Sequence, residues 1–255
     1  MGWFCPTFQR PERLAELALS WEKTVAGKIL YVRVWDKDPR KDDYFSYEWP
    51  EGWILYESDK EWAGEALNEH FDQHPDDGFY GFIGDDIVLR TKHGLDVLEH
   101  TAGNMFMAYP NDTVHRHRMY THFCLGGGTA RSFGFVIPRV FYHFNMDRAL
   151  GFIMANCGLQ RYCPQVIFQH KHFLWGRSER DDTYKKVYGD IPLKELDKFI
   201  PPDEKEYLEW EAREGRMLAL ELRKRLVSRY ERTEEWNKED IRQFMGVEES
   251  AILCN

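Results

Sequence analysis

The chain has 255 residues, of which 43% are hydrophobic and 15% aromatic, so it can bury a full core as one α/β domain or as a domain with an appendage. Its formal net charge of -9 argues against a surface that neutralises many phosphates non-specifically, although a local basic groove is compatible with it. The composition excludes a disordered tail and leaves nucleic acid only as a specific acceptor.

The cysteines and the apolar runs indicate where the protein works. Five cysteines are scattered, odd in number and without the close paired spacing of a zinc or redox motif, which predicts a reduced, intracellular protein. The first twenty residues lack a basic start followed by an apolar core, and no run of about 18 apolar residues occurs. We therefore expect no membrane span and a cytoplasmic location.

The first ninety residues alternate between strand and helix patterns. Short apolar runs at 2–5, 28–35, 54–56 and 79–83 predict strands, and helical patterns cover 10–21 and 61–71. The second and fourth strands end in acids, at 36–38 and 85–86. Such alternation predicts an α/β fold with a mostly parallel, Rossmann-like central sheet flanked by helices, whose ligands lie beyond the carboxyl ends of the strands.

The rest of the chain is more helical. We expect helices near 94–100 and at 147–156, a glycine-rich stretch at 126–128, and a strand at 165–168. After Pro201-Pro202, residues 203–230 predict a long amphipathic helix. We therefore divide the chain into a domain at 1–200 and a helical C-terminal extension at 201–255. The extension is a structural element or a homodimer contact, and its basic stretch could touch a polyanionic acceptor.

Two clusters of metal-ligand residue types follow predicted strands. Asp85 and Asp86 stand at a sheet edge, where carboxylates can hold a divalent cation against a diphosphate, although an Asp pair beside Gly84 is also common in solvated turns. His170 and His172 point to the same face of a strand, and two imidazoles with an Asp suit manganese or magnesium. The alternative is one structural and one solvated histidine.

Other polar residues each have a structural and a functional interpretation. The loop at 6–11 is a strand-to-helix turn, or it brings Arg10 against a nucleotide. Asp36 and Asp38 are turn acids, or they contact a uracil or ribose. Asp147 is a helix N-cap, and a carboxylate facing the cleft there could also act as a general base.

Two further segments keep both interpretations open. Thr121 and His122, preceded by Asp112, line an acceptor site or make local loop hydrogen bonds. Residues 181–185 begin a capped helix, or they belong to a closing lid whose side chains approach the diphosphate. The lid side chains would be Arg177, Tyr184 and Lys185.

Taken in order, these pieces resemble GT-A glycosyltransferases of the family 2-like type, and more narrowly small glycosyltransferase-like proteins of bacteriophages and their hosts. The resemblance runs from about residue 4 to about residue 186. Its motifs are Pro6-Thr7 with Arg10-Pro11-Glu12-Arg13-Leu14, Asp36-Lys37-Asp38-Pro39, Ala66-Leu67-Asn68, Phe82-Ile83-Gly84-Asp85-Asp86, Tyr120-Thr121-His122, Asp147, Gly158 to Pro164, His170-Lys171-His172 and Asp181-Asp182-Thr183-Tyr184.

The resemblance implies a metal-dependent enzyme that transfers a sugar from a nucleotide donor, such as a UDP-sugar, to an acceptor hydroxyl. Its donor residues would be Thr7, Arg10, Asp36, Asp38, Asn68 and Asp85. Asp86 with His170 or His172 would bind Mn²⁺ or Mg²⁺. Asp147 would be the base of an inverting transfer. The acceptor would be a saccharide or a hydroxylated (hydroxymethyl) base in phage DNA, contacted by Asp112, Thr121 and His122. A phage-encoded chain would work in the host cytoplasm.

Two other functions use similar residues. A nucleotidyltransferase also combines carboxylates with a divalent ion, but it would want a lysine- or glycine-rich loop after the first strand, which residues 6–11 lack. A non-catalytic module that binds sugar nucleotides or nucleic acid would keep the fold without turnover.

Overall fold

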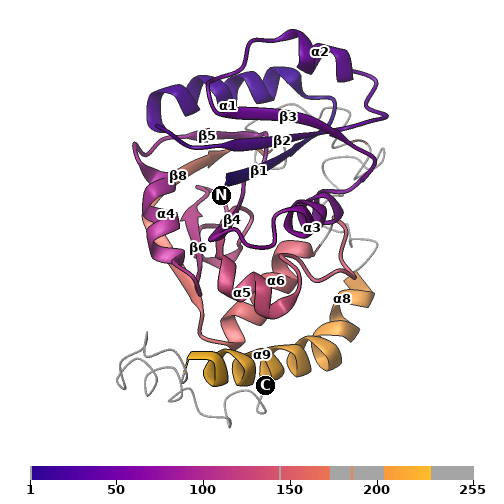
Figure 1. Cartoon of the computed structure of the whole chain (residues 1–255), viewed down its shortest axis with the longest axis vertical. Helices are drawn as coiled ribbons and strands as arrows, with labels where there is room; N and C mark the ends of the chain where they lie inside the picture. The colour runs from indigo at the N-terminus through magenta and orange to yellow at the C-terminus, as the bar shows by residue number, and fades with distance from the viewer. Residues whose placement is uncertain (1, 144, 173–184, 186–203, 231–255) are drawn as a thin grey trace.

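The computed structural model describes residues 2–143, 145–172, 185 and 204–230 (Figure 1). They form an eight-stranded sheet in the order β3-β2-β1-β4-β7-β6-β8-β5, with helices on both faces. The strands are β1 Gly2–Thr7, β2 Leu30–Trp35, β3 Trp53–Ser58, β4 Phe79–Phe82, β5 Ile87–Leu89, β6 Met107–Asn111, β7 Phe123–Gly126 and β8 Gln160–His170. The helices are α1 Pro11–Thr24, α2 Lys41–Ser46, α3 Ala63–Gln73, α4 Gly94–Ala102, α5 Gly127–Phe133, α6 Met146–Asn156, α8 Glu204–Trp210 and α9 Arg216–Tyr230, with a short 3₁₀ turn at Arg116–Arg118.

The N-terminal half is the parallel part of the sheet. β1 lies between β2 and β4 and is parallel to both, and β2 is parallel to β3. Pro11 begins α1, where a missing N–H costs nothing, and the apolar stripe of α1 packs against the face of β2 that carries Val32 and Val34. The strands and helices expected in this half are confirmed, with β1, β2 and β4 ending side by side.

The C-terminal half makes the sheet mixed. β7 is antiparallel to both β4 and β6, and β5 is antiparallel to β8, while β6 and β8 are parallel. β6 and β7 carry no strand prediction, because β6 contains Pro110 and β7 runs straight into glycines. Those glycines allow the start of α5 to pack against the backbone just before β4, since a Cβ on Gly127 would lie 2.0 Å from the carbonyl oxygen of Asp77.

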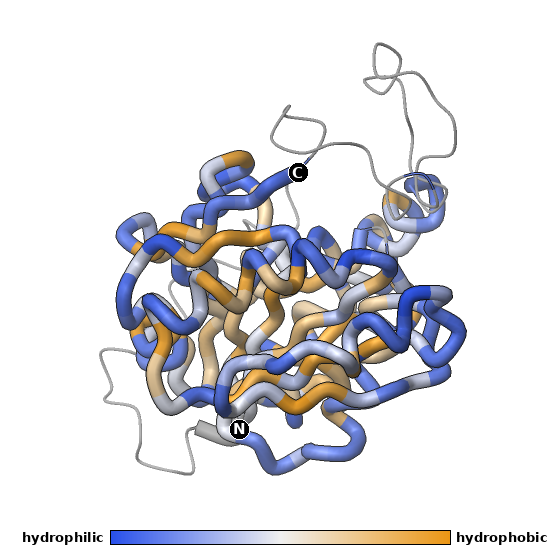
Figure 2. The backbone as a smooth tube through the Cα atoms, turned by 90° about the horizontal axis from the view of Figure 1, so that it is seen from above, coloured by the Kyte–Doolittle hydropathy of each residue, from blue (hydrophilic) through white to orange (hydrophobic). Residues whose placement is uncertain are grey.

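Two hydrophobic clusters lie on the two faces of the sheet. One joins the sheet to α3, α5 and α6, and the other joins it to α1 and α4. Figure 2 shows the hydrophobic stretches of the chain running through the middle of the molecule and the hydrophilic ones in its outer loops and helices. The polar residues that follow β1, β4 and β8 therefore leave a packed sheet at defined positions.

The helices α8 and α9 lie across the end of the molecule that is opposite α1 and α2 (Figure 1). Tyr207, Trp210 and Leu222 are buried in the first hydrophobic cluster, and the Trp210 ring packs at right angles to Phe141 with 5.1 Å between centroids. Between the two helices, Glu211–Gly215 forms one wide turn of π-helical form. A Cβ on Gly215 would lie 2.9 Å from the Trp210 ring, so this turn needs a glycine there. The division of the chain at residue 200 stays a prediction.

Among the helices described, none is both long and apolar enough to cross a lipid bilayer.

Candidate functional site

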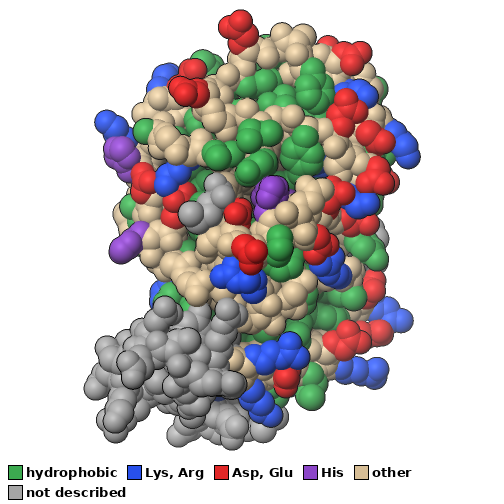
Figure 3. All heavy atoms as spheres, viewed as in Figure 1, with side chains coloured by type: hydrophobic (Ala, Val, Ile, Leu, Met, Phe, Trp, Pro, Cys, Tyr) green, Lys and Arg blue, Asp and Glu red, His purple; other side chains and the backbone are tan. Residues whose placement is uncertain are grey.

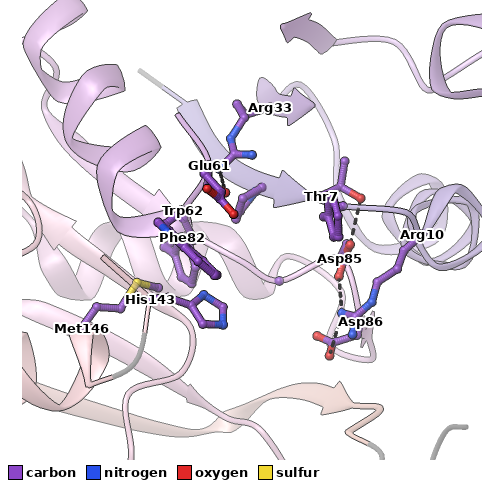
Figure 4. Close-up of a pocket in the computed structure, with 14 residues that line it drawn as sticks. Thr7, Arg10, Arg33, Glu61, Trp62, Phe82, Asp85, Asp86, His143 and Met146 are labelled. Carbon is purple, nitrogen blue, oxygen red and sulfur yellow. Dashed lines mark hydrogen bonds and ion pairs between the residues drawn. The ribbon is translucent and has the colours of Figure 1, made fainter. Parts of the chain in front are cut away.

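Two adjacent carboxylates lie where β4 leaves the sheet. Asp85 accepts a hydrogen bond from the Thr7 hydroxyl, 2.8 Å to its Oδ2, and one from Arg10 Nη1, 3.1 Å to its Oδ1. Arg10 Nη1 also lies 3.6 Å from Asp86 Oδ2 (Figure 4). Asp85 and Asp86 are only 5% and 9% exposed. The loop after β1 therefore supplies the cation that makes a buried acid pair tenable.

A chain of hydrogen bonds holds that loop in place. The backbone N–H of Arg10 donates to the buried Tyr44 hydroxyl at 2.6 Å, and this hydroxyl lies 3.1 Å from Thr7 Oγ1. Because Thr7 gives its one proton to Asp85, Tyr44 donates to Thr7. Asp38 accepts from the backbone N–H of Gln9 at 2.7 Å, which stabilises the positive φ of 55° at Gln9.

The acid pair meets a histidine from the other half of the chain. β5 and β8 place Ile87 opposite His170, and the backbone N–H of Lys171 donates to the Asp86 carbonyl at 2.8 Å. As a result Asp86 Oδ1 lies 3.4 Å from His170 Nε2. The rings of His170 and His172 are 5.3 Å apart and perpendicular. The strand pair, rather than the loops, sets this spacing.

The charges in this cluster are strongly coupled. Burial raises the pKa of Asp85 to about 6, with Asp86 adding to the rise and Arg10 and Thr7 opposing it. Burial lowers the pKa of His170, but the carboxylates of Asp86 and Asp112 outweigh it and raise that pKa to about 9. His170 therefore holds a proton at neutral pH that a bound cation would displace, since metal ligation requires the neutral imidazole.

Asp86 and His170 fit one side of a divalent-cation site. Within the described residues no three His, Cys, Asp or Glu side chains form a complete metal-binding group. Two ligands at right angles with bonds of 2.0–2.1 Å lie about 3 Å apart, near the 3.4 Å between Asp86 Oδ1 and His170 Nε2. Mg²⁺ and similar ions commonly take one or two carboxylates and complete their shell with substrate phosphates and water. The pair suits an ion held in that way.

His122 lies behind the acid loop. Its Nδ1 accepts a hydrogen bond of 3.2 Å from the backbone N–H of Gly84, and burial lowers its pKa to about 3. The His122 ring is 5.0 Å from the ring of His170. His122 is therefore a neutral histidine that supports the loop carrying Asp85 and Asp86.

Asp112 organises a loop beside His170. Its Oδ1 accepts from the backbone N–H groups of Val114, His115 and Arg116 at 3.0, 2.7 and 2.7 Å. Its Oδ2 accepts from the Thr121 hydroxyl at 3.2 Å and lies 4.0 Å from His170 Nδ1. Asp112 and His122 thus lie beside His170, with Thr121 bound to Asp112, and contact of these three with an acceptor stays a prediction.

Asp147 lies in the first turn of α6. It is half-buried, and its Oδ1 accepts a hydrogen bond of 2.8 Å from the backbone N–H of Arg148. Burial raises its pKa, while the Arg148 N–H and the charge of His115 oppose the rise. His115 also interacts electrostatically with Asp112 and His170, which places Asp147 on the histidine side of the cluster.

A cavity of about 190 Å³ opens beside the acid pair. It lies between the end of β1, the middle of β2, the loop after β4, the start of α3 and the residues around the start of α6 (Figure 4). Its walls are Pro6, Thr7, Phe8, Arg10, Arg33, Glu61, Trp62, Ala63, Phe82, Gly84, Asp85, Asp86, His143 and Met146. Thr7, Arg10, Asp85 and Asp86 of the predicted site therefore share one cavity.

Three predicted donor residues do not line this cavity. Asp36 and Asp38 are absent from its walls, and Asp38 uses both carboxylate oxygens on backbone N–H groups. The Asn68 amide pairs with the backbone of Val136 and Ile137, so it holds the segment after α5. Their contacts with a donor stay predictions.

Sequence reasoning missed Arg33, Tyr44 and Trp62. The signal for Arg33 was available, since it is a cation between two valines, five residues after Lys28 begins the predicted strand at 28–35. Tyr44 gave no signal, because its role appears only when α2 meets the loop after β1.

The predicted lid lies mostly outside the described residues. This holds for Arg177 and Tyr184, whereas Lys185 is described and exposed. On the face drawn in Figure 3, acidic and basic side chains of the described residues are interspersed, with a histidine near the centre. That face therefore offers no continuous basic surface built from described residues.

Comparison with known proteins gives a fold match without a sequence match. No family model matches the sequence, and no curated protein does. The fold is similar to the mannosyltransferase PcManGT from Pyrobaculum calidifontis in complex with GDP-Man and Mn²⁺, with a TM-score of 0.55 and 11% identity over 91% of this chain and 75% of that chain.

Two other likenesses have a TM-score of 0.49. One is to glucosyl-3-phosphoglycerate synthase from Mycobacterium tuberculosis, at 11% identity over 67% of this chain and 70% of that chain. The other is to S. aureus TarS 1-349, at 10% identity over 96% of this chain and 78% of that chain. The likeness to the mannosyltransferase confirms the predicted fold class: the chain has a GT-A-like α/β fold.

Proposed function

We propose that this protein is a metal-dependent glycosyltransferase that transfers a sugar from a nucleoside diphosphate donor to an acceptor hydroxyl. The observation that carries the proposal is the meeting of Asp86 and His170, from opposite halves of the chain, beside a cavity that also holds Arg10 and Asp85. The fold adds support, since the mannosyltransferase that shares it was solved with GDP-Man and Mn²⁺.

The chain's own residues would bind the donor across the ends of β1 and β4. Thr7 and Arg10 border the cavity and hold Asp85 in one orientation. The Arg10 guanidinium also lies within ion-pair distance of both carboxylates of the acid pair, so it would face the diphosphate. Holding the donor in one pose removes orientational freedom before the reaction, a large part of what an enzyme contributes.

Asp86 and His170 would hold Mn²⁺ or Mg²⁺, with His172 nearby. When bound, such an ion stabilises the negative charge that develops on the leaving nucleoside diphosphate. His170 would give up its proton to become a ligand, and Asp112 would orient the ring from its Nδ1 side.

Asp147 is the proposed general base. Burial raises its pKa toward the working pH, which suits a carboxylate that takes a proton from a hydroxyl. General-base help of this kind is worth about 10²- to 10⁴-fold in rate. Attack by the activated hydroxyl on the face opposite the leaving group would invert the anomeric carbon.

The acceptor is proposed to be a saccharide or a hydroxymethylated base in phage DNA. The net charge of -9 and the mixed charges in Figure 3 favour a saccharide. The exposed Lys224 and Arg225 on α9 keep DNA in the comparison. Parallel transfer assays with oligosaccharides and with duplex DNA containing hydroxymethylated bases would separate the two.

The test of the proposed function is release of nucleoside diphosphate from sugar nucleotides with Mn²⁺ present. A thermal-shift screen of GDP, UDP, ADP and CDP sugars selects the donor, because a ligand at 100 times its Kd stabilises by about 2.7 kcal/mol. For a chain of this size that corresponds to a rise in Tm of about 5–11 °C. Donor binding without released nucleoside diphosphate would indicate a binding module. Release of pyrophosphate from a nucleoside triphosphate and a sugar phosphate would indicate a nucleotidyltransferase.

A further inference from the structure

One arginine points from the sheet into the cavity. Arg33 lies in the middle of β2, between Val32 and Val34, which face the cluster under α1. Because side chains alternate along a strand, Arg33 lies on the opposite face and reaches the cavity wall (Figure 4). It is 2% exposed, so its charge is shielded from water.

The described residues give Arg33 no carboxylate within ion-pair distance. Its only hydrogen bond to them is a long one of 3.4 Å, from Nη2 to the backbone carbonyl of Glu61, and its buried Nε has none. Tyr56 lies next to Arg33 on the neighbouring strand β3. Its hydroxyl does not accept a hydrogen bond from Arg33, since it has no hydrogen-bond partner among the described residues. A buried guanidinium whose one acceptor among the described residues is the distant Glu61 carbonyl is costly, which indicates that a ligand supplies further acceptors.

The cavity beside Arg33 fits a flat ring system. Its volume of about 190 Å³ is below the ~300–1,000 Å³ of sites that enclose a whole ligand, so it takes one part of a larger molecule. Phe8, Trp62 and Phe82 contribute aromatic walls, with Met146 beside them. Aromatic side chains bind nucleobases by stacking, whichever base it is.

The donors of Arg33 then select among bases. A guanidinium pairs in two-pronged fashion with two adjacent acceptors, as guanine presents with O6 and N7. Adenine replaces O6 with an amino donor, which would oppose the arginine donors, and uracil offers a single acceptor, O4, at the equivalent edge.

Glu61 distinguishes a base from an acidic sugar. It lies on the same wall as Arg33, drawn beside it in Figure 4. A carboxylate there would repel the carboxylate of a uronic acid, whereas it can accept hydrogen bonds from the N–H groups of guanine.

We propose that this cavity binds the guanine of a guanosine diphosphate donor and that Arg33 reads O6 and N7 of the base. The proposal rests on the proposed function, because it assigns the nucleotide of the same donor. Arg33 is then a specificity residue, which contacts the base and not the reacting atoms.

The decisive measurement changes one atom of the ligand and keeps the native protein. Calorimetric titration in Mn²⁺ compares GDP with 7-deaza-GDP, in which a C–H replaces N7. 7-deaza-GDP keeps O6 and loses only the N7 half of a two-pronged contact worth about 1–3 kcal/mol, so it should bind about 2- to 13-fold more weakly, which corresponds to about 0.5–1.5 kcal/mol. ADP and UDP should also bind more weakly than GDP.

A variant assigns the effect to Arg33. In Arg33→Met, which removes the donors to both O6 and N7, GDP should bind at least as weakly as 7-deaza-GDP binds to the native protein, and the two ligands should then bind equally. Arg139→Met is the matched control, since Arg139 is an exposed arginine paired with Asp72 outside the cavity. It should keep the full preference for GDP. The native-protein comparison stands even if Arg33→Met does not fold.

Each other outcome overturns something specific. Equal binding of GDP, 7-deaza-GDP and ADP refutes base reading by Arg33 and leaves the glycosyltransferase proposal intact. Base reading by Arg33 is also refuted if the native protein binds UDP-glucuronate more tightly than UDP-glucose and Arg33→Met does not. That result would make the cavity a sugar subsite and would leave the glycosyltransferase proposal intact. If no nucleoside diphosphate binds, both this inference and the proposed donor class are wrong.

Discussion

The Asp112 carboxylate offers the sharpest test of whether a predicted site residue binds an acceptor or builds the loop that surrounds the site. Replacing it by alanine removes the acceptor of three backbone N–H groups at 3.0, 2.7 and 2.7 Å. Hydrogen bonds to a charged group contribute about 1.5–3 kcal/mol each when buried. Residues 114–116 are half-buried or exposed, so water reaches the freed N–H groups, and about 1 kcal/mol each is the better value.

The expected loss for Asp112→Ala is therefore about 3 kcal/mol, or about 6–12 °C in Tm for a chain of this size. Asp112→Asn is the matched control. It keeps one acceptor oxygen for the three N–H groups and should lose about 1 kcal/mol. Urea unfolding followed by circular dichroism measures both variants. An alanine variant as stable as the native protein, with weakened acceptor binding, would show that the carboxylate serves the acceptor and that the structural reasoning is wrong.

Three further outcomes follow from the site and the core. Asp86→Ala should abolish the Mn²⁺-dependent gain in donor affinity, and EDTA should lower the native protein to the same level; a variant that still responds to Mn²⁺ would remove Asp86 from the metal site. Asp147→Asn should keep donor binding and lose about 10²- to 10⁴-fold in transfer rate, and full activity would exclude it as the base. Burial lowers the pKa of His70 from 6.5 to about 4, so its contribution is present above pH 6.5 and is lost as pH falls toward 4. The native protein should then lose about 2 kcal/mol more than His70→Phe between pH 7 and pH 4.5 in urea unfolding, and parallel pH profiles would contradict this.

The proximity of the acid pair to Thr7 and Arg10 could be predicted from the sequence. Asp85 and Asp86 follow a short apolar run that predicts a buried strand, and Thr7 and Arg10 follow another, so parallel neighbours bring the four together. The sequence also places His170 at a strand end. The sequence does not reveal that β5 pairs with β8, because contacts between distant segments leave no local pattern. The meeting of His170 with the acid pair could therefore not be derived from it.

The acids after β2 show a second limit. Asp36 and Asp38 follow a strand, as ligand residues often do, yet in the structure the Asp38 carboxylate accepts from the backbone N–H groups of Gln9 and Arg40. Side chains of Asp close turns and bind ligands with the same oxygens. Arg33 is the opposite case. Its place inside a strand does not mark it as a ligand residue, and only the folded structure shows that it is buried in the cavity wall.

The wide turn between α8 and α9 fixes the number of residues that this segment must contain. Regular helix advances about 100° per residue, so deleting one residue between 211 and 215 would restore an even repeat and swing everything downstream by that angle. Leu222 and Ala219 would then leave their places against the body of the protein, and charged neighbours would be turned inward. Single-residue insertions and deletions should therefore be tolerated in the surface loops and rejected here, a pattern that a library of length variants would make visible.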